Sequence, residues 1–176
     1  MGKLGRSSCE TEPVTDILAC PHPKAAGRNV VFLLPGGMHA AAEPCQVVTI
    51  LGSCVSVCLW ETKEKLGGMN HYLLPRCGAD ISSSMRFADV AIPELLRRML
   101  EMGAKRERIT AKVFGGAALH RGESEYASSL GAGNVEAARR ILASELITVV
   151  AQDTGGQRGR KVIFHTDEGI VWAKPV

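Results

Sequence analysis

The feature that most constrains the fold is a succession of short β-rich segments separated by turns that contain glycine or proline. Such segments recur along most of the chain, and the last two are joined by a tight turn at Asp167-Glu168-Gly169 that predicts a hairpin. The sequence predicts strands at 29–34, 46–51, 54–60, 69–75, 109–116, 146–152, 161–166 and 170–175.

Helical periodicity is confined to two long segments. From Ala88 to Met102, apolar residues recur three or four positions apart, with Asp89 as a candidate N-cap and Gly103 at the end. A second helix is expected to follow Asn134, a good N-cap residue. Because strands and helices do not alternate regularly, the sequence predicts an α+β fold, a sandwich of packed β-sheets flanked by helices, rather than a doubly wound parallel sheet.

Composition narrows the class of protein. The 176 residues are 45% hydrophobic and 22% charged with a net charge of +3, as expected for one globular domain over 29–176. Residues 1–28 lack periodicity and are interpreted as a loose leader. A low aromatic content and the absence of basic blocks argue against nucleic acid, and no apolar run is long enough for membrane insertion. Without a secretory signal, a cytoplasmic location with reduced thiols is expected.

The stretch VVTILGSCVSVCLW, residues 47–60, raises the question of what Cys54 does. Alternation places Cys54, Ser56 and Cys58 on one face of a strand and leaves an apolar face opposite. Cys54 alone lies beside the Gly52-Ser53 turn, where outward-pointing backbone N–H groups can stabilise an oxyanion. This position favours a nucleophile.

His71, in the stretch GGMNHYLLP, is a candidate base for that nucleophile. A hairpin of this length can bring His71 beside the start of the preceding strand, where contact would lower the pKa of the Cys54 thiol. Other interpretations stay open: Cys58 as core packing, a metal site of Cys54, Cys58 and His71, or a disulfide. His120 is interpreted as a surface loop residue.

The ordered motifs TILGSCVSVCLW, GGMNHYLLP, MRFADVAIPELLRRMLEMGA, AKVFGGAAL, GAGNVEAARRIL and GGQRGRKVIFHTDEGIVW resemble those of the chemoreceptor glutamine deamidases, the CheD family. The resemblance covers roughly residues 29–173. It implies a sandwich of the toxin-like cysteine hydrolase type, which hydrolyses glutamine side chains on methyl-accepting chemotaxis receptors without a metal or other cofactor.

In that family, the cysteine of GSC is the nucleophile and the histidine of H-x-x-L-P is its base, roles that fall on Cys54 and His71. The third catalytic residue is a threonine upstream of the cysteine, and the candidate is Thr49. The family pattern also allows the position of Val48, so Thr49 could equally be an ordinary β-branched strand residue. The alternative function is a non-catalytic module that docks on receptors or on a CheC-type phosphatase.

Overall fold

The computed structural model describes residues 28–78, 84–118 and 125–176, and within 125–128 only the backbone. Residues 1–27 of the expected leader, and His120, lie outside the described residues. No observation tests the proposed division into a leader and one domain over 29–176, which stays a prediction.

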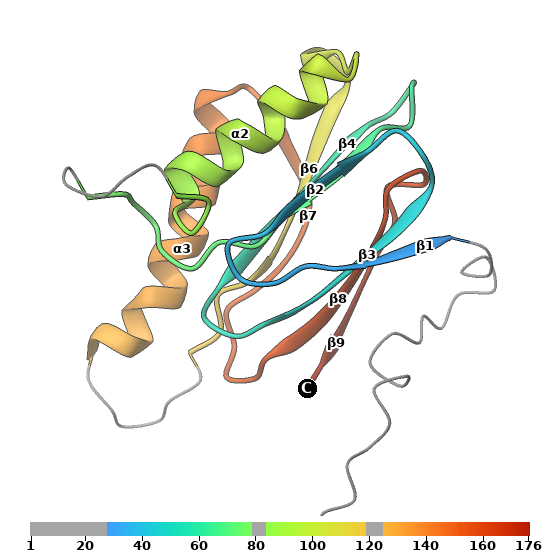
Figure 1. The fold of residues 1–176 in the computed structure, drawn as a ribbon. Helices are drawn as coiled ribbons and strands as arrows, with labels where there is room; N and C mark the ends of the chain where they lie inside the picture. The colour runs from blue at the N-terminus through green and yellow to red at the C-terminus, as the bar shows by residue number, and fades with distance from the viewer. Residues whose placement is uncertain (1–27, 79–83, 119–124) are drawn as a thin grey trace, which may run out of the picture.

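The described strands form two β-sheets that pack face to face, and the helices α2 (Ala88–Glu101) and α3 (Glu125–Ser144) lie over the outer face of one of them (Figure 1). The five-stranded sheet has the order β2 (Met38–Ala41), β5 (Gly67–Asn70), β4 (Val55–Glu61), β6 (Ile109–Gly115) and β7 (Thr148–Thr154). The four-stranded sheet has the order β1 (Asn29–Phe32), β3 (Cys45–Leu51), β8 (Arg160–His165) and β9 (Val171–Pro175). The prediction of an α+β sandwich is confirmed.

Both sheets are mixed. Within the four-stranded sheet, β1 runs parallel to β3, whereas β8 is antiparallel to both β3 and β9. Within the five-stranded sheet, β6 and β7 are parallel and the other neighbours are antiparallel. A short 3-10 helix η2 (Arg106–Arg108) leads into β6. The predicted hairpin of the last two strands is confirmed.

Two hydrophobic clusters account for the layers. One fills the space between the helices and the five-stranded sheet and includes Val55, Val57 and Leu59 of β4. The other lies between the sheets, where Cys58 is buried and Cys54 packs at its border. The predicted separation of the two faces of β4 is therefore confirmed, and so is the burial expected of Cys58.

Several element boundaries differ from the sequence prediction. Strand β2 was not predicted, because its residues MHAA carry no strand pattern and are ordered by pairing with β5. Strand β5 ends at Asn70, and beyond it isolated bridges join Tyr72 to Val55 and Leu74 to Phe87. Strand β4 begins at Val55, so Cys54 immediately precedes it.

The prediction that Asn134 caps the second helix is wrong. Helix α3 already begins at Glu125, and Asn134 lies inside it, completely buried. Packing requires glycine at 131 within this helix, because a Cβ there would lie 2.5 Å from the carbonyl oxygen of Gly116. Tertiary contact overrides the local signal.

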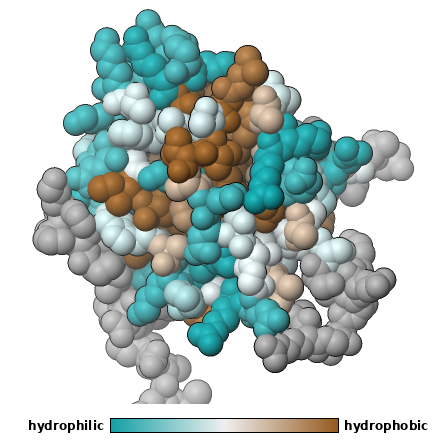
Figure 2. All heavy atoms as spheres, turned by 180° about the vertical axis from the view of Figure 1, so that it is seen from behind, coloured by the Kyte–Doolittle hydropathy of each residue, from teal (hydrophilic) through white to brown (hydrophobic). Residues whose placement is uncertain are grey.

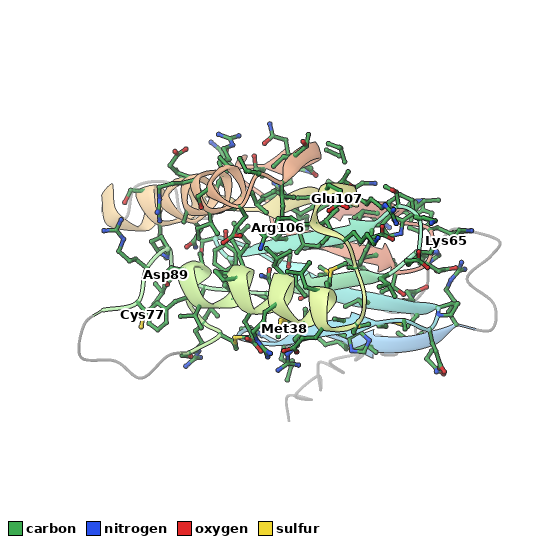
Figure 3. All side chains as sticks on the ribbon, turned by 90° about the horizontal axis from the view of Figure 1, so that it is seen from above. Met38, Lys65, Cys77, Asp89, Arg106 and Glu107 are labelled. Atoms are coloured by element: carbon green, nitrogen blue, oxygen red, sulfur yellow. The ribbon has the colours of Figure 1, made fainter. Side chains whose placement is uncertain are left out.

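The N-cap predicted at Asp89 is also wrong. Helix α2 begins at Ala88 with Phe87 in the capping position, without a side-chain cap. Both carboxylate oxygens of Asp89 instead accept the backbone N–H of Cys77 at 3.0 Å, and the two residues lie side by side in Figure 3. Gly103 adopts a left-handed φ of 99° just after the helix, as its predicted role requires.

The surface mixes polar and apolar side chains. Figure 2 shows hydrophobic residues gathered in the middle and upper part of the far face, with hydrophilic residues around them. Leu34, Leu146 and Val150 are among the exposed apolar residues, and scattered exposed apolar side chains are ordinary on folded proteins. In the described part of the chain, neither helix combines the length and apolar character needed to cross a bilayer.

Candidate active site

Cys54 lies in the turn Gly52-Ser53-Cys54, which carries the chain from β3 in one sheet to β4 in the other. All three carbonyl oxygens of this turn accept hydrogen bonds. The oxygen of Gly52 accepts from the N–H of Ala117 and that of Cys54 from the N–H of Gly116, both at 2.8 Å. The oxygen of Ser53 accepts from the side-chain amide of Asn134 at 3.0 Å. Hydrogen bonds from the segment after β6 and from α3 therefore fix the backbone of this turn.

The end of β6 approaches this turn closely because Gly115 has no side chain. Gly115 has a φ of 110°, a conformation that favours glycine, and a Cβ there would collide with the carbonyl oxygen of Cys54. The glycine pair of the VFGG motif thus lets the backbone of β6 support the turn that carries the thiol.

His71 reaches the same face as Cys54 through the register of β4 and β5. The ladder pairs Cys58 with Met69, and the bridge pairs Val55 with Tyr72 through two backbone hydrogen bonds of 3.0 and 3.1 Å. In this register His71 lies opposite Ser56 and diagonal to Cys54, with all three side chains on the face toward the other sheet. The register therefore places the predicted pair on the same face, at diagonal positions.

Thr49 of β3, in the opposite sheet, contacts the ring of His71. Its hydroxyl donates to the carbonyl oxygen of Leu33 at 2.7 Å and lies 2.9 Å from Nδ1 of His71. A carbonyl oxygen can only accept, so the single hydroxyl proton goes to Leu33 and the oxygen of Thr49 must accept from an Nδ1–H. The neutral ring then has its lone pair on Nε2, the nitrogen that a base uses. Thr49, which the sequence left open between a catalytic role and an ordinary strand residue, therefore lies on the face of β3 toward His71.

Burial sets the protonation states of the two groups. It lowers the pKa of His71 to about 4, opposed by the backbone of Leu33. It raises the pKa of the Cys54 thiol, opposed by the backbone N–H of Cys54 itself. At neutral pH the pair is therefore a thiol and a neutral imidazole, whereas the sequence had suggested a thiol pKa lowered by His71. Within the described residues, Nε2 of His71 is buried without a hydrogen-bond partner, Cys54 included.

A groove of about 500 Å³ opens beside Cys54. Its walls are mainly apolar, with one exposed cation on the rim, Arg86. The lining residues are Ser53, Cys54, Leu73, Leu74, Ser84, Arg86, Phe87 and Leu130. Cys54 is partly exposed there, whereas His71 is buried, so a substrate side chain can reach the sulfur from the groove.

Other predicted ligands do not gather around this site. The cysteines at 45, 54, 58 and 77 are free thiols, and burial raises the pKa of Cys58 strongly. Among the described residues, Cys54, Cys58 and His71 do not form a group of three metal ligands.

Asn134 is the residue at this site that sequence reasoning missed. Its side chain contacts Ser53 and Leu73, which lie 81 and 61 residues away along the chain. Asparagine is a common N-cap residue, and Asn134 was therefore interpreted as a helix cap. The local sequence pattern gives no information on partners that are so distant along the chain.

Comparison with known proteins adds independent evidence. Residues 73–175 match the family model described as CheD chemotactic sensory transduction, a range that begins just after His71. A relative from Anaeromyxobacter dehalogenans, named probable chemoreceptor glutamine deamidase CheD 1, is 45% identical over 152 residues, covering 86% of this chain and 88% of the relative. A protein from Trichlorobacter lovleyi named probable chemoreceptor glutamine deamidase CheD is 44% identical over 140 residues, covering 80% of this chain and 86% of the relative.

Proposed function

This chain belongs to the CheD family, and from that premise we propose that it hydrolyses the side-chain amide of glutamines on chemoreceptors, leaving glutamate and ammonia. One observation of the structure carries the proposal. Cys54 lies partly exposed in a groove, in a backbone turn held by three hydrogen bonds, on the same face as a histidine whose ring is fixed by Thr49.

In the first step, Cys54 attacks the amide carbon of the substrate glutamine. Nε2 of His71 accepts the thiol proton as the bond between sulfur and carbon forms, because the pKa of neither group allows an ion pair at rest. The hydrogen bonds that hold the turn use its carbonyl oxygens, and we assign the backbone N–H groups of Ser53 and Cys54 to the oxyanion. His71 then gives the proton to the departing ammonia and a thioester is left on Cys54.

In the second step, water attacks the thioester. Nε2 of His71 accepts a proton from the water and returns it to the sulfur, so that glutamate and the free thiol are released. Thr49 keeps the proton on Nδ1 through both steps and holds the ring in place. The cycle consumes one water and needs no oxidant, reductant or cofactor.

The groove determines what can reach the sulfur. It is an open surface feature, which suits a glutamine presented on the surface of a folded receptor rather than a free small molecule. A receptor substrate on the cytoplasmic side would place this chain in the cytoplasm. A CheC-type phosphatase partner stays a prediction, and no observation favours the non-catalytic alternative.

The test compares variants of Cys54, which immediately precedes β4, and of Cys58, which lies in β4. Receptor fragments are co-expressed with wild type, Cys54→Ala and Cys58→Ala, and conversion of glutamine to glutamate is measured by peptide mass spectrometry. We expect Cys54→Ala to abolish conversion with its fold intact, while Cys58→Ala loses stability but keeps activity. Conversion at the wild-type rate by Cys54→Ala would exclude the nucleophile assigned here.

A further inference from the structure

We propose that Asn134 is a positioning residue of this active site, which fixes the turn of the nucleophile relative to the strand of the base. This inference rests on the proposed function. The side-chain Nδ2 of Asn134 donates to the carbonyl oxygen of Ser53 at 3.0 Å and to that of Leu73 at 2.8 Å. Ser53 precedes Cys54, and Leu73 follows His71 by two residues, so one amide group joins both segments.

The chemistry of the contacts requires an amide nitrogen at this point. Both partners are carbonyl oxygens, which accept only, so the orientation of the amide is fixed by its surroundings. The two N–H groups of one nitrogen satisfy one acceptor each. The backbone carbonyl of Asn134 also accepts the hydroxyl of Tyr72 at 2.7 Å, which ties the residue next to His71 to the same turn of α3.

The helix itself does not explain an asparagine here. Asparagine is a poor residue in a helix interior, and the Oδ1 atom of Asn134 is buried without a partner among the described residues. Both features cost stability. The close packing of Gly131 against Gly116, whose N–H donates to Cys54, brings this part of α3 to the nucleophile turn. The position therefore serves the site rather than the helix.

Loss of this link would change the distance between the thiol and the imidazole. The other hydrogen bonds to the carbonyl oxygens of the turn come from Gly116 and Ala117, which do not belong to the segment of His71. The bridge between Val55 and Tyr72 joins the residue after Cys54 to that segment, so Asn134 adds the link from the residue before Cys54. Attack by a positioned nucleophile is sensitive to displacements of a fraction of an ångström. Removing Asn134 should therefore reduce the rate of the chemical step more than it reduces binding of the receptor.

The experiment compares Asn134→Ala with Leu142→Ala, a fully buried core substitution two turns further along the same helix. Both should lower Tm, and both are assayed where circular dichroism shows them folded. For Asn134→Ala we expect kcat for receptor deamidation to fall roughly tenfold or more with little change in KM. Leu142→Ala should keep the wild-type kcat. Equal kcat in the two variants would overturn the proposal.

A second readout does not depend on the receptor. The rate at which iodoacetamide alkylates Cys54, identified by peptide mass spectrometry, is measured in wild type, Asn134→Ala, His71→Ala and the double variant. We expect each single substitution to slow alkylation and the double variant to be no slower than His71→Ala. Effects that multiply would show that Asn134 acts independently of His71 and would overturn the proposal.

These two readouts separate the inference from the proposed function. A chain that deamidates no receptor, yet shows the non-additive alkylation pattern, would refute the substrate and support the link. If Asn134→Ala does not fold, Asn134→Ser, whose hydroxyl can donate one of the two hydrogen bonds, is judged by the same criteria.

Discussion

Replacing Thr49 by valine keeps the shape of the side chain and removes the hydroxyl that joins His71 to the carbonyl of Leu33. In the native structure this hydroxyl accepts from Nδ1 of His71 at 2.9 Å and donates to Leu33 at 2.7 Å, and Thr49 is fully buried. The substitution leaves two buried polar groups unsatisfied. Since each costs about 1–3 kcal/mol, we expect the free energy of unfolding to fall by roughly 2–6 kcal/mol.

The same substitution should slow catalysis through the tautomer of His71. Without an acceptor at Nδ1, the ring is no longer required to carry its proton there, and Nε2 loses its fixed lone pair. A loss of about 1.4–2.8 kcal/mol in transition-state stabilisation corresponds to a decrease of roughly 10–100-fold in kcat. Binding of the receptor should change little, because Thr49 is buried behind the groove.

The assay measures deamidation of a receptor fragment by peptide mass spectrometry and unfolding in urea for wild type, Thr49→Val and Thr49→Ser. Serine keeps the hydroxyl and is the matched control. We expect Thr49→Ser to retain most of the activity and Thr49→Val to lose it. If the two variants have the same kcat, the hydroxyl does not orient His71 and the tautomer argument is refuted.

Two further predictions follow from the backbone and from the buried imidazole. Gly115→Ala should lower kcat at least about tenfold, because its Cβ would collide with the Cys54 carbonyl. The control is Gly103→Ala, at a position with a similarly positive φ and open space around it. Equal kcat in the two variants would contradict the prediction. Because burial lowers the pKa of His71 from 6.5 to about 4, the folded state binds its proton less readily than the unfolded state. The contribution of His71 to the free energy of unfolding is fully present above pH 6.5, declines as the pH falls and is lost through pH 4. The total loss is about 3 kcal/mol. Urea unfolding at several pH values should show this slope in wild type and a smaller slope in His71→Gln, and identical slopes would contradict the assignment.

Part of the site could be predicted from the sequence because its determinants are local. Alternation along a strand places Cys54 and Cys58 on one face, and a hairpin of ordinary length brings His71 to the same face. The facing of Thr49 was left open by the sequence, and its contact with His71 is known only from the structure. The α+β class followed in the same way from the order of the segments.

The rest depends on contacts between distant parts of the chain. The role of Asn134 is set by Ser53 and Leu73, and the start of α3 is decided by packing near Gly131 rather than by the cap signal. Strand β2 forms because its residues pair with β5 at the edge of the sheet. The direction of the pKa shift at Cys54 also escaped prediction, because desolvation by the surrounding fold raises this pKa more than the backbone N–H of Cys54 lowers it.

The supports of the nucleophile turn have a consequence for biosynthesis. The groups that hold Cys54 in place come from residues 116, 117 and 134, all of which leave the ribosome well after the thiol itself. A nascent chain that has exposed its cysteine and histidine, but not yet α3, carries both reactive groups without the frame that aligns them. The hydrogen bonds that hold the nucleophile turn are therefore complete only after α3 has been made.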